Sequence, residues 1–149
     1  MNFDGITSGI RVDTIKQLYQ DIAQYTSVIC PLSEPDVINA LMSSEDKNFA
    51  MLGNGLAFPN FKSEKLIDPV ITFMKLETPL DIDTPDHKPI DLVIMVASPM
   101  CDGSKHLSLL SRISRMFRDE DLCAKLRSAE DDDALSAILE YPLILQEAA

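Results

Sequence analysis

Two runs of mainly apolar residues constrain the fold of this chain most strongly. The first spans residues 70–76, and the second spans residues 91–97, with five apolar residues in succession from Leu92 to Val96. Neither run has the period of an amphipathic helix, and both are too short to cross a bilayer. Such runs are typical of strands that are covered on both faces. They predict a sheet that lies between layers of helices.

Amphipathic patterns on both sides of these runs predict the covering helices. Before the runs, one helical face is formed by Ile15, Leu18, Tyr19, Ile22, Tyr25 and Ile29. Ser33–Asp36 then has the form of a capping box that opens a second helix. After the runs, three more helices carry His106, Leu109, Leu110 and Ile113, then Leu122 and Leu126, then Leu135, Ile138 and Leu139. We therefore predict two helices, a central sheet and three helices, in one layered α/β domain over residues 1–149.

Turn residues punctuate the middle of the chain. Gly53-Asn54-Gly55 predicts a tight turn, because glycine adopts backbone conformations that other residues avoid. We expect a short strand at Leu56–Phe58, ended by Pro59. Residues 83–89, which are rich in aspartate and proline, predict a connection between the two apolar runs.

Charge and cysteine content disfavour several classes of function. The chain has 24 acidic and 13 basic residues, a net charge of −11, which disfavours binding to nucleic acid or to an anionic membrane. Its three cysteines have no metal or disulfide spacing and no signal sequence is visible, so we expect a cytoplasmic protein without metal or cofactor. The acidic runs at residues 119–121 and 130–133 indicate a solvated helix face or, alternatively, a docking patch for a basic partner.

Residues 53–60 read Gly-Asn-Gly-Leu-Ala-Phe-Pro-Asn. This segment resembles the signature of the enzyme IIA proteins of the phosphotransferase system, fructose/mannitol and nitrogen-regulatory type, which reads approximately G-N-G-I-A-I-P-H. The resemblance continues in register through Leu76–Leu80, Lys88–Val93 and the 99–111 stretch with Lys105-His106-Leu107, and covers about residues 35–140. It implies the fold of that family, a central mixed β-sheet flanked by helices, and a role in the nitrogen-regulatory branch.

The resemblance also shows where this chain departs from the family. In the family, the histidine that ends the signature carries the phosphoryl group, and Asn60 stands at that position here. An amide nitrogen is not a nucleophile at neutral pH, although it can imitate the hydrogen bonding of a neutral histidine. The family's arginine, 16 residues earlier, and its threonine match Ser44 and Ala50. Three losses together indicate natural divergence rather than one engineered change, and we expect a degenerate site with no catalytic residue.

His106 matches the second histidine of the family's site. Three roles stay open for it: a buried histidine bonded to a neighbour, a remnant that orders Asn60, or an independent phosphorylation site. A hydrolase is disfavoured, because the serines near His106 lack the G-x-S-x-G arrangement of a nucleophile elbow.

Two functions from different classes are compatible with this resemblance. The first is a regulatory binding module that cannot be phosphorylated and acts through protein–protein contacts. The second is a phosphocarrier that accepts a phosphoryl group from a histidine-containing carrier protein. The missing nucleophile favours the first, with a carrier protein, a transporter or a sensor kinase as the implied partner. We expect its binding surface at Phe58, Asn60, Phe61 and His106, with a core position as the alternative for Phe61.

Overall fold

The computed structural model describes residues 2–43, 49–82, 84, 86–101 and 103–148, with the backbone alone for residues 49–50 and 141–148. Within these ranges the strands are β1 (Gly5–Ile10), β2 (Phe49–Gly53), β3 (Leu56–Ser63), β4 (Val70–Leu80) and β5 (Ile90–Pro99). The helices are α1 (Ile15–Ile29), α2 (Glu34–Ser43), α4 (Gly103–Met116), α5 (Glu120–Ser128) and α6 (Asp132–Ala148). All of the predicted helices are present.

The strands form one sheet in the order β1-β4-β5-β3-β2. β1 pairs with β4, and β3 with β5, in parallel, whereas the β4–β5 and β2–β3 pairs are antiparallel. The sheet is therefore mixed, as expected. The two apolar runs are β4 and β5, which are neighbours inside the sheet and extend beyond the predicted bounds.

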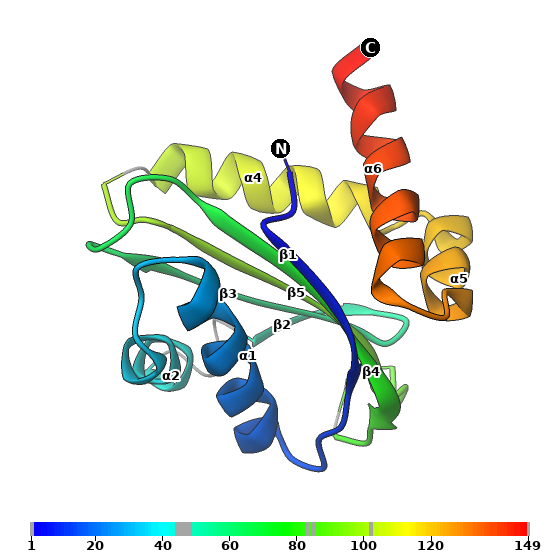
Figure 1. Ribbon diagram of the computed structural model, residues 1–149, viewed down its shortest axis with the longest axis horizontal. Helices are drawn as coiled ribbons and strands as arrows, with labels where there is room; N and C mark the ends of the chain where they lie inside the picture. The colour runs from blue at the N-terminus through cyan, green and yellow to red at the C-terminus, as the bar shows by residue number, and fades with distance from the viewer. Residues whose placement is uncertain (1, 44–48, 83, 85, 102, 149) are drawn as a thin grey trace.

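Helices cover both faces of this sheet, with α1 and α2 on one side and α4, α5 and α6 on the other (Figure 1). Successive side chains of a strand point to opposite faces, so each inner strand contributes to two cores. Met95 packs in the cluster that contains Leu18 of α1, whereas its neighbour Ile94 packs with Ile113 of α4. The layered α/β domain predicted from the sequence is confirmed.

Short polar side chains begin the helices. The Thr14 hydroxyl accepts a hydrogen bond from the Gln17 backbone N–H at 3.1 Å, at the start of α1. Ser33 and Asp36 make the reciprocal bonds of a capping box, Ser33 Oγ accepting from the Asp36 N–H at 3.2 Å and Asp36 Oδ2 from the Ser33 N–H at 3.3 Å. Asp131 caps α6 by accepting from the Ala134 N–H at 2.8 Å.

Two strands were not predicted. β1 precedes the first helix, so the order "two helices, then a sheet" is wrong at its start. β1 lies at the sheet edge, where only β4 pairs with it. Its polar and apolar residues alternate only weakly, since Gly5, Ser8 and Gly9 are among its six residues. β2 is the opposite edge strand. Edge strands need fewer apolar residues, because one side of each has no neighbouring strand, so sequence patterns indicate them poorly.

The expectation that Pro59 ends its strand is also wrong, since β3 continues to Ser63. Proline lacks the N–H that a strand donates to its neighbour. Among the described residues, Phe49–Pro59 is the last pair between β2 and β3, whereas β5 pairs with β3 on both sides of the proline, at Ala57 and again from Asn60 to Ser63. Pairing with β5 on either side of Pro59 therefore continues the strand past the missing N–H.

Candidate functional site

Asn60 lies on the face of β3 that α4 covers. Leu56 and Phe58 pack in the core on the α4 side, and Ala57 and Phe61 pack in the core beneath α1 and α2. The alternation of a strand therefore places Asn60 on the same face as Phe58. Its side chain is half-buried, and its Nδ2 donates a hydrogen bond to the Phe58 carbonyl at 3.0 Å.

His106 lies in the first turn of α4 and faces the end of β5. Its Nδ1 is 2.7 Å from the hydroxyl oxygen of Ser98, and the two side chains are only 7% and 2% exposed. Burial, and secondly the charge of the Lys62 ammonium, lower the pKa of His106 from its usual value of 6.5. The imidazole is therefore neutral at pH 7. His106 is thus a buried histidine bonded to a neighbour, and its roles as a remnant that orders Asn60 or as a phosphorylation site stay predictions.

The sheet brings Asn60, Lys62, Ser98 and His106 together. β3 and β5 run parallel with Asn60 beside Val96 and Lys62 beside Ser98, so the four residues share one face at the end where both strands finish. This is the end of the sheet at which α4 begins, on the left in Figure 1. We call these four residues the Asn60 site. In the described part of the chain, no hydrogen bond joins Asn60 to His106.

Phe58 and Phe61 do not lie on this surface. Their side chains are 3% and 5% exposed, one packed toward α4 and the other toward α1 and α2. A partner protein cannot contact either ring in this arrangement. These two aromatic side chains therefore pack in the core instead of forming the expected binding surface. Of the other residues matched to the family's site, Ser44 lies outside the described residues, and the backbone of Ala50 lies in β2 opposite Phe58.

Three exposed apolar residues surround the same end of the sheet, and sequence reasoning missed them. Ile67, Met100 and Leu107 are 91%, 47% and 67% exposed. Ile67 lines a small cavity of about 120 Å³ together with Ser98 and His106. Met100, which follows β5, donates its N–H to the Ser63 carbonyl at 3.1 Å, and Leu107 follows His106 on α4. We call these three residues the apolar rim; each follows or adjoins the end of an element, a position that hydrophobic periodicity does not single out.

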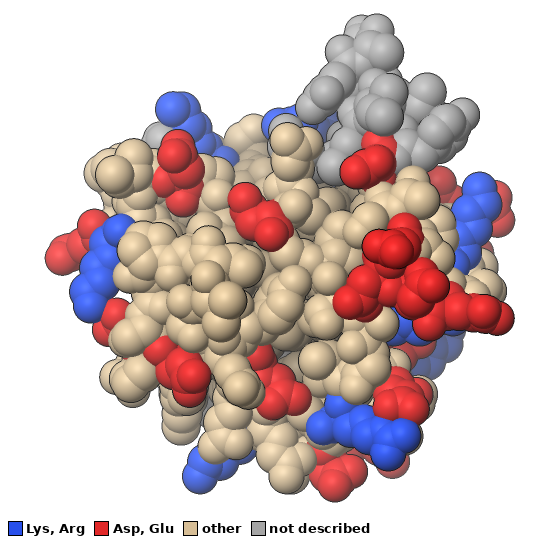
Figure 2. Space-filling view, in the orientation of Figure 1, with Lys and Arg blue, Asp and Glu red and all other residues tan. Residues whose placement is uncertain are grey.

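The acidic run at residues 130–133 lies elsewhere on the molecule. Its four side chains are exposed, and Figure 2 shows acidic groups gathered over the connection from α5 to α6. Asp131 caps α6, and Asp132 Oδ1 accepts a hydrogen bond from the Ser8 hydroxyl at 2.6 Å. These contacts agree with the reading of a solvated helix start.

Comparisons with known proteins agree with the resemblance in sequence. The family described as "Phosphoenolpyruvate-dependent sugar phosphotransferase system, EIIA 2" matches residues 11–141. The chain belongs to this family. It is 32% identical to a nitrogen regulatory protein of Bradyrhizobium diazoefficiens, over 93% of this chain and 91% of that relative. It is therefore an enzyme IIA-like protein related to the nitrogen regulatory proteins.

Solved structures confirm the fold of this enzyme IIA-like chain. The nitrogen regulatory protein IIA-Ntr from Neisseria meningitidis superposes with a TM-score of 0.81 at 24% identity, over 91% of this chain and 92% of that one. The enzyme IIA of the Escherichia coli mannitol system, in its complex with phosphorylated enzyme IIB, superposes with a TM-score of 0.73 at 15% identity, over 94% and 96% of the two chains.

The groups present at the Asn60 site limit its chemistry. Asn60 can donate and accept hydrogen bonds, Lys62 supplies an exposed positive charge, and Ser98 and His106 are buried against each other. In the described part of this enzyme IIA-like chain, no group of three or more His, Cys, Asp or Glu side chains could hold a metal ion. Among the same residues, no helix has the length and apolar character that crossing a membrane requires.

Proposed function

We propose that this chain is a regulatory binding module of the nitrogen-related phosphotransferase system, which accepts no phosphoryl group and acts in the cytoplasm through protein–protein contacts. The observation that carries the proposal is Asn60, which stands where the family's signature ends in histidine and which offers no nucleophilic atom. Among the described residues around it, the Ser98 hydroxyl is buried and paired with the His106 ring.

A phosphocarrier is the second candidate, and one observation favours it. The lowered pKa of His106 keeps its imidazole neutral, with one nitrogen lone pair available for attack on phosphorus. However, the ring is 7% exposed and its Nδ1 is held by Ser98. A phosphorylated donor would have to move α4 or the loop before it in order to reach this nitrogen. The carrier role is therefore the weaker candidate.

The exposed surface around the Asn60 site supports the contact role. Exposed apolar side chains lower the free energy when a partner covers them, and the apolar rim brings three of them to one end of the sheet. Lys62 adds a positive charge that suits an acidic residue of the partner. The complex of enzyme IIA with enzyme IIB in the mannitol system is a precedent for docking by this fold. A histidine-containing carrier protein, a transporter or a sensor kinase is the proposed partner.

A phosphorylation assay tests the missing acceptor. The purified chain is incubated with radiolabelled phosphoenolpyruvate, enzyme I and the cognate histidine-containing carrier protein, and acid-labile label is measured on each protein. We expect label on enzyme I and on the carrier, which serve as internal controls, and none on this chain. Stoichiometric label that disappears in His106→Ala would establish the phosphocarrier role instead.

A further inference from the structure

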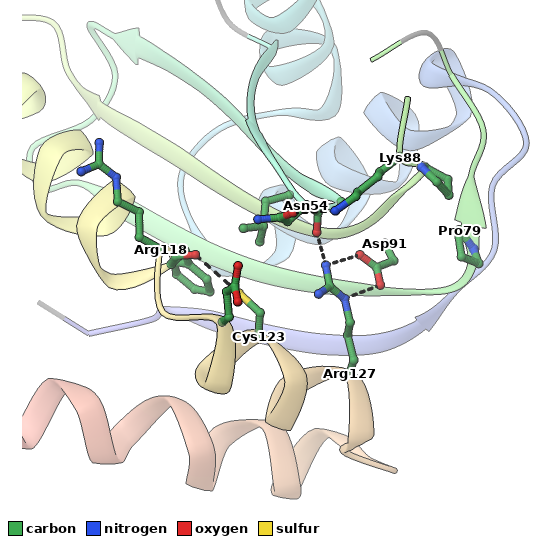
Figure 3. Close-up of a pocket in the computed structure, with 12 residues that line it drawn as sticks. Asn54, Pro79, Lys88, Asp91, Arg118, Cys123 and Arg127 are labelled. Atoms are coloured by element: carbon green, nitrogen blue, oxygen red, sulfur yellow. Dashed lines mark hydrogen bonds and ion pairs between the residues drawn. The ribbon is translucent and has the colours of Figure 1, made fainter. Parts of the chain in front are cut away.

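A pocket of about 500 Å³ opens at the other end of β3 and β5 (Figure 3). It lies where the two strands begin, between the β2–β3 turn, the start of β5 and helix α5; its lining includes Asn54, Leu56, Lys88, Asp91, Arg118 and Arg127. β5 rises by about 3.3 Å per residue, so Asp91 is roughly 20 Å from Ser98 of the Asn60 site. The two sites are therefore separate surfaces.

Hydrogen bonds hold the wall of this pocket in one arrangement. Gly53, Asn54 and Gly55 all have positive φ, at 83°, 55° and 80°. The turn that they form is fixed from two sides: Lys88 Nζ donates to Asn54 Oδ1 at 2.9 Å, and Arg127 donates to the Asn54 carbonyl. Arg127 also makes a forked pair with the Asp91 carboxylate, at 2.7 and 3.0 Å. A wall that is already ordered loses little conformational entropy when a ligand binds.

Basic residues outnumber acidic residues in the lining of the pocket, whereas acidic residues outnumber basic ones in the whole chain. The lining has three basic residues, Lys88, Arg118 and Arg127, and two acidic ones, Asp91 and Glu120, whereas the chain has 13 basic and 24 acidic residues. Arg127 and Asp91 neutralise each other.

Apart from this pair, the lining has two cations, Lys88 and Arg118, and one anion, Glu120. Lys88 bonds to a neutral amide, and among the described residues the Arg118 side chain makes no hydrogen bond or ion pair. Asp86, which also interacts with the Lys88 charge, is outside the lining and accepts hydrogen bonds from the backbone N–H groups of Asn54 and Lys88. The two cations lie on opposite sides of the pocket (Figure 3).

The remaining lining is apolar. Leu56, Phe117 and Cys123 are 3%, 2% and 4% exposed and form its floor, and Pro79 and Pro89 border it. Small-molecule sites commonly have volumes of about 300–1,000 Å³ and combine an apolar lining with a few polar groups. The geometry points to a binding site for a small organic anion, in which Lys88 binds a carboxylate or phosphate group, Arg118 on the opposite side adds positive charge, and the floor covers an apolar body.

A titration of the full-length protein followed by ¹H–¹⁵N NMR tests this site. The probes are benzoate and phenyl phosphate, which are apolar rings with one anionic group, and benzyl alcohol and inorganic phosphate, which each lack one of the two features. We expect saturable shifts at the amides of Asn54, Gly55 and Asp91 with one or both aromatic anions, and at least about tenfold weaker binding of the other two probes. The stronger aromatic anion identifies the acid group that the site prefers. Absence of saturable shifts, shifts centred on the Asn60 site, or equal binding of benzyl alcohol would overturn the proposal.

Matched charge variants complete the test. Arg118→Met and Lys88→Met each remove one cation from an exposed position of the lining. Lys88→Met should weaken binding of the stronger anion by about tenfold and Arg118→Met should weaken it by less, while Lys88→Arg should retain binding. Lys16→Met removes the same charge from an exposed position on α1, in the opposite layer, and should leave binding unchanged. Equal losses in Lys16→Met and Arg118→Met, or parent-like binding by both lining variants, would contradict the proposal. Neither outcome depends on whether the chain accepts a phosphoryl group.

Discussion

Burial of His106 against Ser98 makes the stability of this protein depend on pH in a predictable direction. An exposed histidine of the unfolded chain titrates near pH 6.5, whereas burial and Lys62 lower the pKa of His106 in the fold. Below about pH 6.5 the unfolded chain therefore binds more protons than the folded protein does. The contribution of His106 to stability is complete above that pH and decreases as the pH falls toward the folded-state pKa.

Urea unfolding at pH values between about 7.5 and 5.5 measures this dependence. We expect His106→Gln to lose less unfolding free energy than the parent over this range. His87→Gln, which changes the exposed histidine of the 83–89 connection, is the matched control. An unchanged dependence in His106→Gln would show that His106 is not its source.

Gly55 occupies a position that no other residue can take without strain. Its φ is +80°, and a Cβ added there would lie 2.5 Å from Asp91 Oδ1 and 3.0 Å from both Arg127 Nη2 and the Pro89 carbonyl oxygen. Gly55→Ala should therefore lower the unfolding free energy by about 1–3 kcal/mol, because both the backbone and the Arg127–Asp91 pair must move. Chemical denaturation measures the loss.

A second glycine supplies the control for this prediction. A Cβ added at Gly103, the first residue of α4, meets nothing within 4 Å. Gly103→Ala should cause no loss of stability, since alanine favours the helix over glycine. Equal losses in the two variants would show that the crowding at Gly55 is not the cause.

At the scale of the elements, Lys75 fastens helix α5 to the sheet. Its Nζ extends from β4 and donates to the carbonyls of Arg127 and Ala129, at 2.6 and 2.7 Å, where the helix ends. These carbonyls lack partners within the helix, and an ammonium near a helix C-terminus is also favoured by the helix dipole. The contact keeps Arg127 in reach of Asp91 and so shapes the pocket.

We expect Lys75→Met to destabilise the protein by about 1.5–3 kcal/mol, since it removes half-buried charge-assisted hydrogen bonds. Hydrogen exchange should speed up most in α5. Lys65→Met is the matched control: Lys65 bonds to Asp36 at 2.7 Å, but the pair is exposed, so its loss should cost little stability. If the two variants lose similar stability, Lys75 does not fasten α5 as described.

At the scale of the whole molecule, the proposed docking face predicts which surface changes weaken partner binding. Ile67→Asp and Leu107→Asp place a charge on the apolar rim, and Asn60→Asp adds one to the Asn60 site with little change in shape. Each should weaken binding of a histidine-containing carrier protein by about tenfold or more, measured by NMR or calorimetric titration. The melting temperature should stay close to that of the parent for the two rim variants, because these side chains are exposed.

Two controls lie on other faces of the molecule. Val28→Asp introduces the same charge at an apolar residue of α1 that is 82% exposed, and should leave binding unchanged. Glu130→Lys with Asp133→Lys reverses charge in the acidic run and spares Asp131, which caps α6. If the rim variants bind as tightly as the parent while the acidic-run variant does not, the docking face lies at the α5–α6 connection.

The sequence by itself determined the parts of this protein whose signals are local. The runs that became β4 and β5, the helical faces and the Ser33–Asp36 capping box are each encoded by neighbouring residues, and each was predicted. The identity of Asn60 in the signature was also readable without a structure. The reason is physical: hydrophobic period, unbroken apolarity and capping act over a few residues.

Only the tertiary structure decided the rest. β1 is a strand because β4 pairs with it some 67 residues further along the chain, and Phe58 and Phe61 are buried because helices cover both faces of β3. The order of the strands places Ile67, Met100 and Leu107 around the Asn60 site. The pocket exists because Arg127 reaches Asp91 across 36 positions of the sequence. Contacts between distant residues depend on how the sheet is ordered and covered, and no local pattern of residues specifies that.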